Sequence, residues 1–220
     1  MSVGDGELLR PVRAPRGWNS FDSIGSANET QVRAAIAALG AGAVLGPTYE
    51  YVEMDGFWFN NPNEANSESL DAYGGPARFP SLNGSLGPLA DEAHAAGLKL
   101  GIWQLFGVPK GAVARQLPIF GTPYTAADIA LNDSVASGCG WAAWEGYSVN
   151  MSHPAGQAWY DGLVALWAGW GLDLIKLDCV FGGVLDLGLI WNILLVLSSI
   201  PAHTHAASQT LHLVSMLAGC

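Results

Sequence analysis

Apolar residues recur along this chain in two patterns. Val32 and Ile36 lie at the spacing of one helix face, which predicts a helix over 29–40. Short apolar runs that end in a polar or charged side chain predict buried strands, and the clearest are 49–55 and 173–178. The same patterns predict further strands over 17–21 and 98–103, and further helices over 88–96, 125–131 and 154–170.

The order of these elements favours a parallel α/β sheet with helical crossovers. Two of the predicted strands end in an acid, Asp55 and Asp178. Ligands of such folds collect at the carboxyl ends of the strands, so the two acids are candidates for a shared site. Strand-end aspartates also make turns, and that structural alternative stays open.

The segment Leu174–Asp178 carries the most specific candidate chemistry. Side chains two apart share one face of a strand, so Lys176 and Asp178 are expected to point the same way. An ammonium beside a carboxylate keeps the carboxylate ionised, and an ionised carboxylate suits nucleophilic attack on a sugar carbon. The alternative is an ion pair that only closes the strand.

Composition narrows the classes of protein. The chain has 220 residues, of which 50% are hydrophobic and 13% charged, enough for one domain with a substantial core. A net charge of −10 argues against nucleic acid and against an anionic membrane surface as partners. The glycines after residue 39 do not form a dinucleotide motif, and the three cysteines contain no Cys-x-x-Cys pair. No cofactor or metal is therefore predicted.

Composition also divides the chain into three parts. Residues 1–15 read as an irregular lead-in and 16–182 as an α/β domain, whereas 183–220 is an atypical apolar tail with one charged side chain. His203 and His205 in this tail lack a third ligand for a metal. We expect that the tail is not the natural continuation of the domain, as in a splice variant, a frameshift or a misread intron.

Four Asn-x-Ser/Thr sequons, at 28, 83, 132 and 150, favour a secretory, vacuolar/lysosomal or extracellular location. Residues 1–16 contain no apolar core of a signal peptide. The compartment is therefore left open, and the sequence does not indicate an oligomeric state.

Six segments stand in the order of a known family: 16–22, 49–58, 78–81, 88–91, 96–102 and 170–179. Through them the chain from Arg16 to Gly182 resembles the α-galactosidase (melibiase) family, glycoside hydrolase family 27. The resemblance implies a (β/α)8 barrel, of which this chain would hold the N-terminal half to two-thirds. It also implies hydrolysis of terminal α-linked galactose with retention, on a small-molecule or oligosaccharide substrate.

The resemblance also implies roles for individual residues. Asp178 falls on the nucleophile, and Lys176 on the lysine that contacts the sugar and supports that carboxylate. Trp18 would line the sugar pocket, and Asp55 would hold galactose hydroxyls. Family members commonly link the cysteine after the nucleophile to one in an earlier loop, which would pair Cys179 with Cys139; buried free thiols are the alternative.

Two departures from the family pattern bear on activity. Gly56 stands where well-known members carry a second aspartate, which puts the galactose specificity in doubt. The family's acid/base aspartate lies far beyond Gly182, and Glu145 is the only substitute that we could nominate. Retaining hydrolysis needs two carboxyl groups about 5–5.5 Å apart, so we expect this chain to be inactive or nearly so.

Two other functions remain open. A non-catalytic carbohydrate-binding fragment would keep Trp18, Asp55 and Trp58 as a sugar cradle. A barrel hydrolase with another sugar specificity, such as a β-L-arabinopyranosidase or an α-N-acetylgalactosaminidase, would fit the glycine at position 56.

Overall fold

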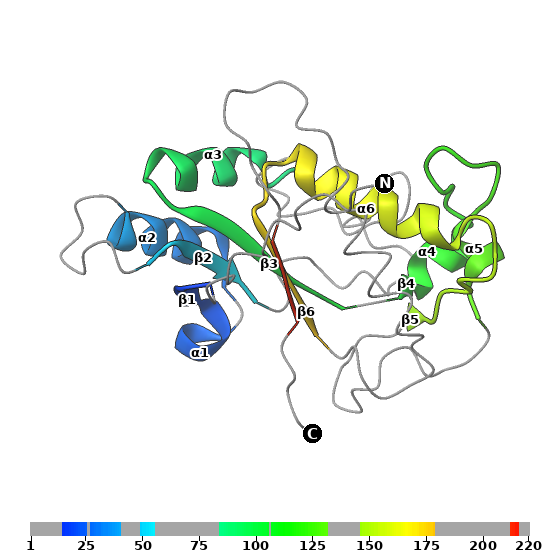
Figure 1. The fold of residues 1–220 in the computed structure, drawn as a ribbon. Coiled ribbons are helices and arrows are strands. Elements are labelled where there is room, and N and C mark those ends of the chain that lie inside the picture. The colour runs from blue at the N-terminus through cyan, green and yellow to red at the C-terminus, as the bar shows by residue number, and fades with distance from the viewer. Residues whose placement is uncertain are drawn as a thin grey trace, which may run out of the picture.

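A five-stranded parallel sheet forms the centre of the protein (Figure 1). The computed structural model describes residues 15–25, 27–40, 49–55, 84–105, 107–131, 146–178 and 212–215. The strands follow the order β1-β2-β3-β6-β7, and they comprise β1 (Gly17–Asn19), β2 (Tyr51–Met54), β3 (Lys99–Leu105), β6 (Leu174–Asp178) and β7 (His212–Ser215). A separate antiparallel pair consists of β4 (Val108–Pro109) and β5 (Gly146–Tyr147).

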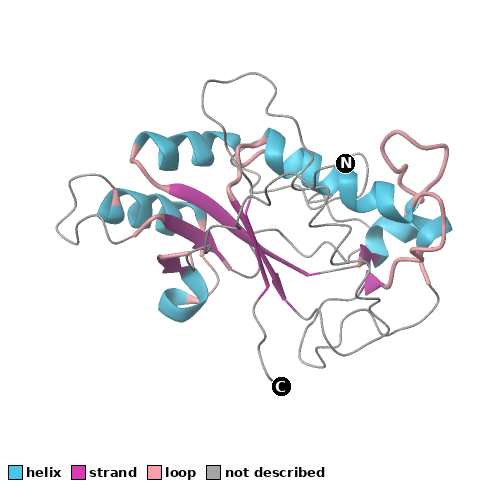
Figure 2. Cartoon of the chain, viewed as in Figure 1, coloured by secondary structure: helices cyan, strands magenta, loops and turns pink. Residues whose placement is uncertain are grey.

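Helices follow the strands in the alternation of a partial (β/α)8 barrel. They are α1 (Ser20–Ile24), α2 (Glu29–Leu39), α3 (Gly87–Ala95), α4 (Lys110–Ala114), α5 (Ala126–Ile129) and α6 (Gly156–Gly169). Figure 2 shows α2, α3 and α6 on the same side of the sheet. None of the helices in the described ranges is long and apolar enough to cross a bilayer.

Helix α2 shows how local sequence sets an element. Asn28 accepts the backbone N–H of Gln31, and the Gln31 side chain accepts the backbone N–H of Asn28, which completes a capping box. The predicted apolar face of this helix is buried, because Val32 and Ile36 are at most 1% exposed. Next to this face, Arg33 forms ion pairs with Glu29 and with Glu92 of α3.

The two faces of the sheet differ in character because side chains alternate along each strand. Val52 and Met54 of β2 join the hydrophobic core that also contains Val32 and Ile36 of α2. Glu53 lies between them in sequence and pairs in register with Asn19 of β1 and Gly101 of β3. The polar residues of β2 therefore belong to the face opposite α2.

The predicted α/β class is confirmed, and each predicted strand and helix has a counterpart within a few residues. Four short elements were not predicted: α1, β4, α4 and β5. Strand β7 lies in the tail, where no strand was predicted, and pairs in parallel with β6. The lead-in up to residue 14 and the rest of the tail lie outside the described residues.

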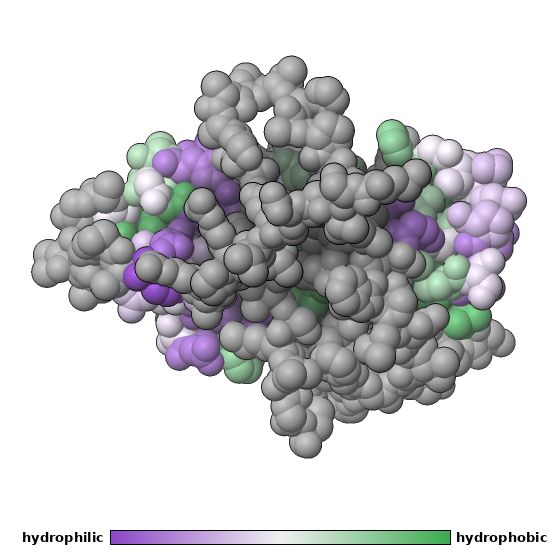
Figure 3. Space-filling model, viewed as in Figure 1, coloured by the Kyte–Doolittle hydropathy of each residue, from purple (hydrophilic) through white to green (hydrophobic). Residues whose placement is uncertain are grey.

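The surface of the described part is mixed. Figure 3 shows hydrophilic and hydrophobic side chains mixed over both the α2–α3 end and the α4–α5 end of this face. The large hydrophobic side chains that are most exposed are those of Phe21 (63%) and Phe120 (62%). Phe21 lies in α1, at the carboxyl end of β1, which is also where the polar cluster described next is found.

Candidate functional site

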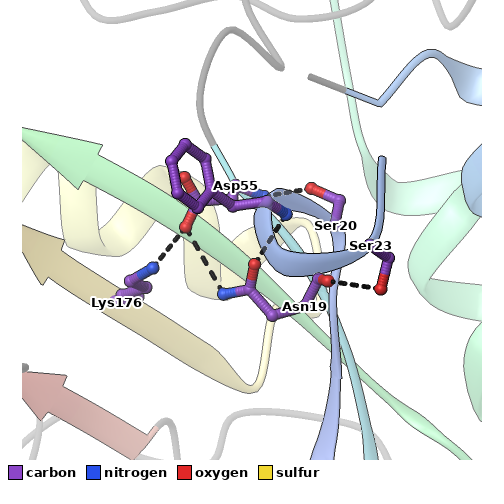
Figure 4. A network of polar contacts seen from close by, with 6 residues as sticks. Asn19, Ser20, Ser23, Asp55 and Lys176 are labelled. Carbon is purple, nitrogen blue, oxygen red and sulfur yellow. Dashed lines mark hydrogen bonds and ion pairs between the residues drawn. The ribbon is translucent and has the colours of Figure 1, made fainter. Parts of the chain in front are cut away.

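Asp55 is the centre of a polar cluster at the carboxyl ends of β1, β2 and β6 (Figure 4). It follows β2 directly, and its backbone N–H donates to Ser20 Oγ over 2.9 Å. Its side chain is only 6% exposed, and its Oδ2 accepts from the ammonium of Lys176, whose side chain is 15% exposed. Strands β2 and β6, far apart in sequence, thus contribute opposite charges to one buried ion pair.

Asn19 connects this pair to β1 and α1. Its Nδ2 donates to Asp55 Oδ2 over 3.4 Å, and its Oδ1 accepts the backbone N–H of Phe21 over 2.7 Å. The second bond caps α1, which begins at the next residue. Ser23 adds a bond from its hydroxyl to the Asn19 carbonyl over 3.2 Å. The helix start and the carboxylate are consequently held by the same side chain.

Glu53 is a second acid of this cluster, two residues before Asp55. It is 5% exposed, and neither of its carboxyl oxygens has a hydrogen-bond partner within the described part of the chain. The pKa of Glu53 is raised from 4.5 to about 8, mainly by burial; the charge of Asp55 adds to this rise, and the charge of Lys176 opposes it. Glu53 is therefore a neutral acid at pH 7, beside an ion-paired one.

The structure brings together two of the predicted site residues, Asp55 and Lys176. Trp18 lies elsewhere: it pairs in register with Val52 and packs against the hydrophobic core, so it is not joined to this cluster. The backbone of Asp178 ends β6 opposite Leu105, whereas its side chain lies outside the described part. Also outside the described residues are Gly56, Trp58, Cys139, Glu145 and Cys179.

Three residues of the cluster were missed by sequence reasoning: Asn19, Ser20 and Glu53. An Asn-Ser pair after a strand is a helix N-cap signal, which would have revealed α1. The period of two that placed Asp55 at the strand end also puts Glu53 on the same face. Its neutral state could not be predicted, because burial depends on strands β1 and β3.

The cluster contains both hydrogen-bond donors and hydrogen-bond acceptors close together. The Lys176 ammonium carries three donors, and the Asp55 carboxylate has acceptor sites beyond those used by Lys176 and Asn19. A polyhydroxylated ligand both donates and accepts, and charge-assisted hydrogen bonds to it are the stronger kind. In the described part, no group of three or more His, Cys, Asp or Glu side chains is placed to hold a metal ion.

Comparison with known proteins identifies relatives of one kind. The chain is 25% identical over 180 residues to α-galactosidase 3 of Hypocrea jecorina, a match that covers 76% of this chain and 27% of that protein. It is also 33% identical over 88 residues to α-galactosidase A of Cellvibrio japonicus, which covers 40% of this chain and 20% of that one. No protein-family model matches the sequence.

Solved structures agree with these matches. A β-L-arabinopyranosidase of glycoside hydrolase family 27 from Geobacillus stearothermophilus superposes with a TM-score of 0.69 at 32% identity, over 84% of this chain and 45% of that one. The predicted resemblance to the α-galactosidases is confirmed. The chain spans about a quarter of the length of the curated relatives and about half of that solved structure.

Proposed function

We propose that this chain, a relative of the α-galactosidases of glycoside hydrolase family 27, forms the sugar-holding part of a retaining glycoside hydrolase of the α-galactosidase type. The observation that carries this proposal is the ion pair between Asp55 and Lys176 at the carboxyl ends of β2 and β6. In barrel enzymes this end of the sheet holds the active site. Asp178 lies two residues beyond Lys176, at the last position of β6.

In the proposed mechanism Asp55 accepts hydrogen bonds from hydroxyl groups of a terminal galactose, and Lys176 donates to the same sugar. These contacts place the anomeric carbon against Asp178, whose carboxylate attacks it to form a glycosyl-enzyme bond. The bond to the leaving group breaks at the same step, and the leaving oxygen takes a proton from a second carboxylic acid. Water then releases the sugar with retained configuration.

Whether the isolated chain can turn over a sugar depends on whether it contains a proton donor for the leaving group. Within the described cluster, Asp55 is bound to Lys176 and Glu53 is almost fully buried, so neither is presented to a leaving group. General acid catalysis contributes a factor of about 10²–10⁴ to the rate. We therefore propose that the 220-residue chain binds the sugar but turns it over poorly.

Calorimetric titration with melibiose tests the binding step. The wild-type chain is expected to bind, whereas Asp55→Asn and Lys176→Met should each lower the affinity at least about tenfold, since each removes a charge-assisted hydrogen bond. Asp91→Asn, an exposed change on α3, is the matched control and should bind as the wild type does. Equal affinity in all four proteins would remove Asp55 and Lys176 from the site.

Turnover is measured separately with an aryl α-galactoside. Slow release of the aryl group that Asp178→Asn abolishes would support the nucleophile. Binding without any release would favour a non-catalytic carbohydrate-binding fragment instead. Fast turnover by the wild-type chain would contradict the expected lack of a proton donor.

A second candidate is a related glycosidase with another sugar specificity. Gly56 replaces a sugar-holding carboxylate of the family pattern, and two of the similar structures are an assigned α-N-acetylgalactosaminidase from Bacillus halodurans (29% identity, TM-score 0.76) and the arabinopyranosidase above. Competition among galactose, N-acetylgalactosamine and L-arabinose in the same titration decides between them. Preference for either of the latter two over galactose would replace the first candidate.

A further inference from the structure

We propose that Glu53 is a positioning residue: in its neutral form it leaves the Lys176 ammonium to Asp55, and its ionisation draws that ammonium away and weakens sugar binding. The inference rests on the proposed function only for its effect on sugar. Its first part, the competition between two acids for one lysine, concerns the protein alone and is tested without a ligand.

The strand register places Glu53 one layer below the ion pair. Glu53 pairs with Gly101, and Gly101 pairs with Leu174 of β6, two residues before Lys176. Because residues two apart share a face, Glu53 and Leu174 lie in one layer, while Asp55 and Lys176 lie in the next layer toward the carboxyl ends. The ammonium of Lys176 therefore has two acids near it: Asp55 in its own layer, and Glu53 in the adjacent layer toward the amino ends of the strands.

Gly101 leaves the room that Glu53 occupies. A Cβ atom at position 101 would lie 3.2 Å from Cγ of Glu53 and 2.8 Å from Cδ2 of Leu174. The acid thus packs over bare backbone, enclosed between β1 and β3. No hydrogen bond from the described residues compensates its two oxygens there, an arrangement that a neutral carboxyl tolerates far better than a carboxylate.

The charges around Glu53 come from several elements. Asp55, directly after β2, and Asp22 on α1 both disfavour its ionisation, and Lys176 on β6 is the opposing cation. Lys99, on the same face of β3, lies farther toward the amino ends and donates to the Tyr51 hydroxyl over 3.4 Å. Once ionised, Glu53 would hold an unpartnered negative charge next to Lys176, so competition with Asp55 for that ammonium follows from Coulomb attraction at low dielectric.

Carbon-13 NMR of the full chain labelled at glutamate Cδ and lysine Cε tests the competition directly. One glutamate carboxyl should titrate close to pH 8, the pKa that burial gives Glu53, and its signal should vanish in Glu53→Gln. The Lys176 Cε resonance, identified with Lys176→Met, should shift over the same pH range in the wild type and stay fixed in Glu53→Gln. A carboxyl at position 53 that titrates near pH 4.5, or a lysine signal that ignores its titration, would overturn the proposal.

Sugar binding gives the second arm. If only the neutral form of Glu53 leaves the site competent, the apparent Kd for melibiose should rise about tenfold between pH 7 and pH 9, following the neutral fraction. Glu53→Gln should abolish this rise, whereas Asp91→Asn should keep it. A flat wild-type profile would refute the proposed effect on the sugar. Absence of binding at every pH would count against the proposed function, and the NMR titration would still decide the role of Glu53.

Discussion

At the scale of single residues, the molecule places one acid in an ion pair and leaves its neighbour on the same strand face uncharged. Asp55 is held by Lys176 and Asn19, whereas Glu53 is enclosed without a hydrogen bond from the described residues. The difference arises from position, because Asp55 stands at the end of β2 and Glu53 stands inside it. Two carboxyl groups of similar intrinsic acidity are therefore in different states, Asp55 ion-paired and Glu53 neutral at pH 7.

Removing the charge of Asp55 is expected to destabilise the fold. Asp55→Asn leaves the Lys176 ammonium buried without its counter-charge, a loss of about 3 kcal/mol in the free energy of unfolding. Urea unfolding at pH 7 measures this value, and Asp91→Asn, on the exposed side of α3, should change it by less than about 0.5 kcal/mol. Equal midpoints for the two variants would show that the pair contributes no stability.

Glu53 gives the unfolding free energy a definite pH dependence. Its pKa is about 8 in the folded chain and near 4.5 when exposed, so the folded state binds one more proton between these values. Stability from this group is therefore complete below pH 4.5 and falls by up to about 1.4 kcal/mol per pH unit until pH 8. Glu53→Gln should remove this slope in urea unfolding measured from pH 5 to 8; an unchanged slope would contradict the raised pKa.

The sequence predicted the positions of some of these site residues but not their contacts. Strand-end position marked Asp55 and Asp178 as acids at one end of a sheet, and the period of two placed Lys176 on the same strand face as Asp178. That Asp55 and Lys176 bind each other depends on the register of β2, β3 and β6, which pairing partners distant in sequence determine. The state of Glu53 depends on the same register, since Gly101 and Asn19 enclose it.

At the scale of elements, periodicity found the long helices and strands and missed the shortest ones. The capping signal of Asn28 and the apolar face of α2 are both local, so that helix was predicted nearly to its ends. Helix α1 has five residues, and β4 and β5 have two each. Such short elements are fixed by contacts rather than by a repeating pattern.

Because β3 and β6 are closely packed at Gly101, an added methyl group should lower the stability of the fold there and not at the loosely packed Gly162. Gly101→Ala should destabilise the chain by about 1–3 kcal/mol, because the new Cβ would lie within 3.2 Å of Leu174 and Glu53. Among the described residues, a Cβ at position 162 of α6 would have only Phe120 within 4 Å, at 3.7 Å, so Gly162→Ala should stabilise by about 0.5–1 kcal/mol through helix propensity. Thermal unfolding of both variants compares them, and equal shifts would exclude the tight contact.

A polar clamp connects α3 to the start of β6 at the opposite end of the sheet. Asp173 Oδ2 contacts His94 Nε2 at 2.8 Å and accepts the Leu100 backbone N–H over 3.0 Å. Asp173→Ala removes both contacts and leaves a buried N–H unpaired, which should lower the free energy of unfolding by about 1–3 kcal/mol. Ser152→Ala, an exposed substitution, serves as the control, and a loss no larger than its own would refute the clamp.

At the scale of the whole molecule, the described sheet has strands paired on both sides at its centre. β3 lies between β2 and β6, whereas β1 pairs only with β2 among the described strands. Amide hydrogen exchange should therefore be slowest in β3 and faster in β1. Exchange in residues 212–215 as rapid as in an unstructured peptide would contradict the parallel pairing of β7 with β6.

The α/β class followed from the order of elements, but the membership of β7 in the sheet did not. Residues His212 to Ser215 have too short an apolar run to predict a strand, and their composition resembles the rest of the tail. Parallel pairing with β6 joins segments more than thirty residues apart, and nothing local encodes such a contact. A tail that composition separated from the domain thus contributes a strand to its sheet.

The side-chain amide of Asn19 couples the Asp55 carboxylate to the start of helix α1. One end of this planar group faces Asp55 and the other supports the first turn of α1, whose Phe21 is exposed. Rotating the group to follow a new neighbour at Asp55 would release the Phe21 amide. A ligand that displaces the Asn19 amide from the Asp55 carboxylate is therefore expected to loosen the first turn of α1 as well, and with it the position of the exposed Phe21 side chain.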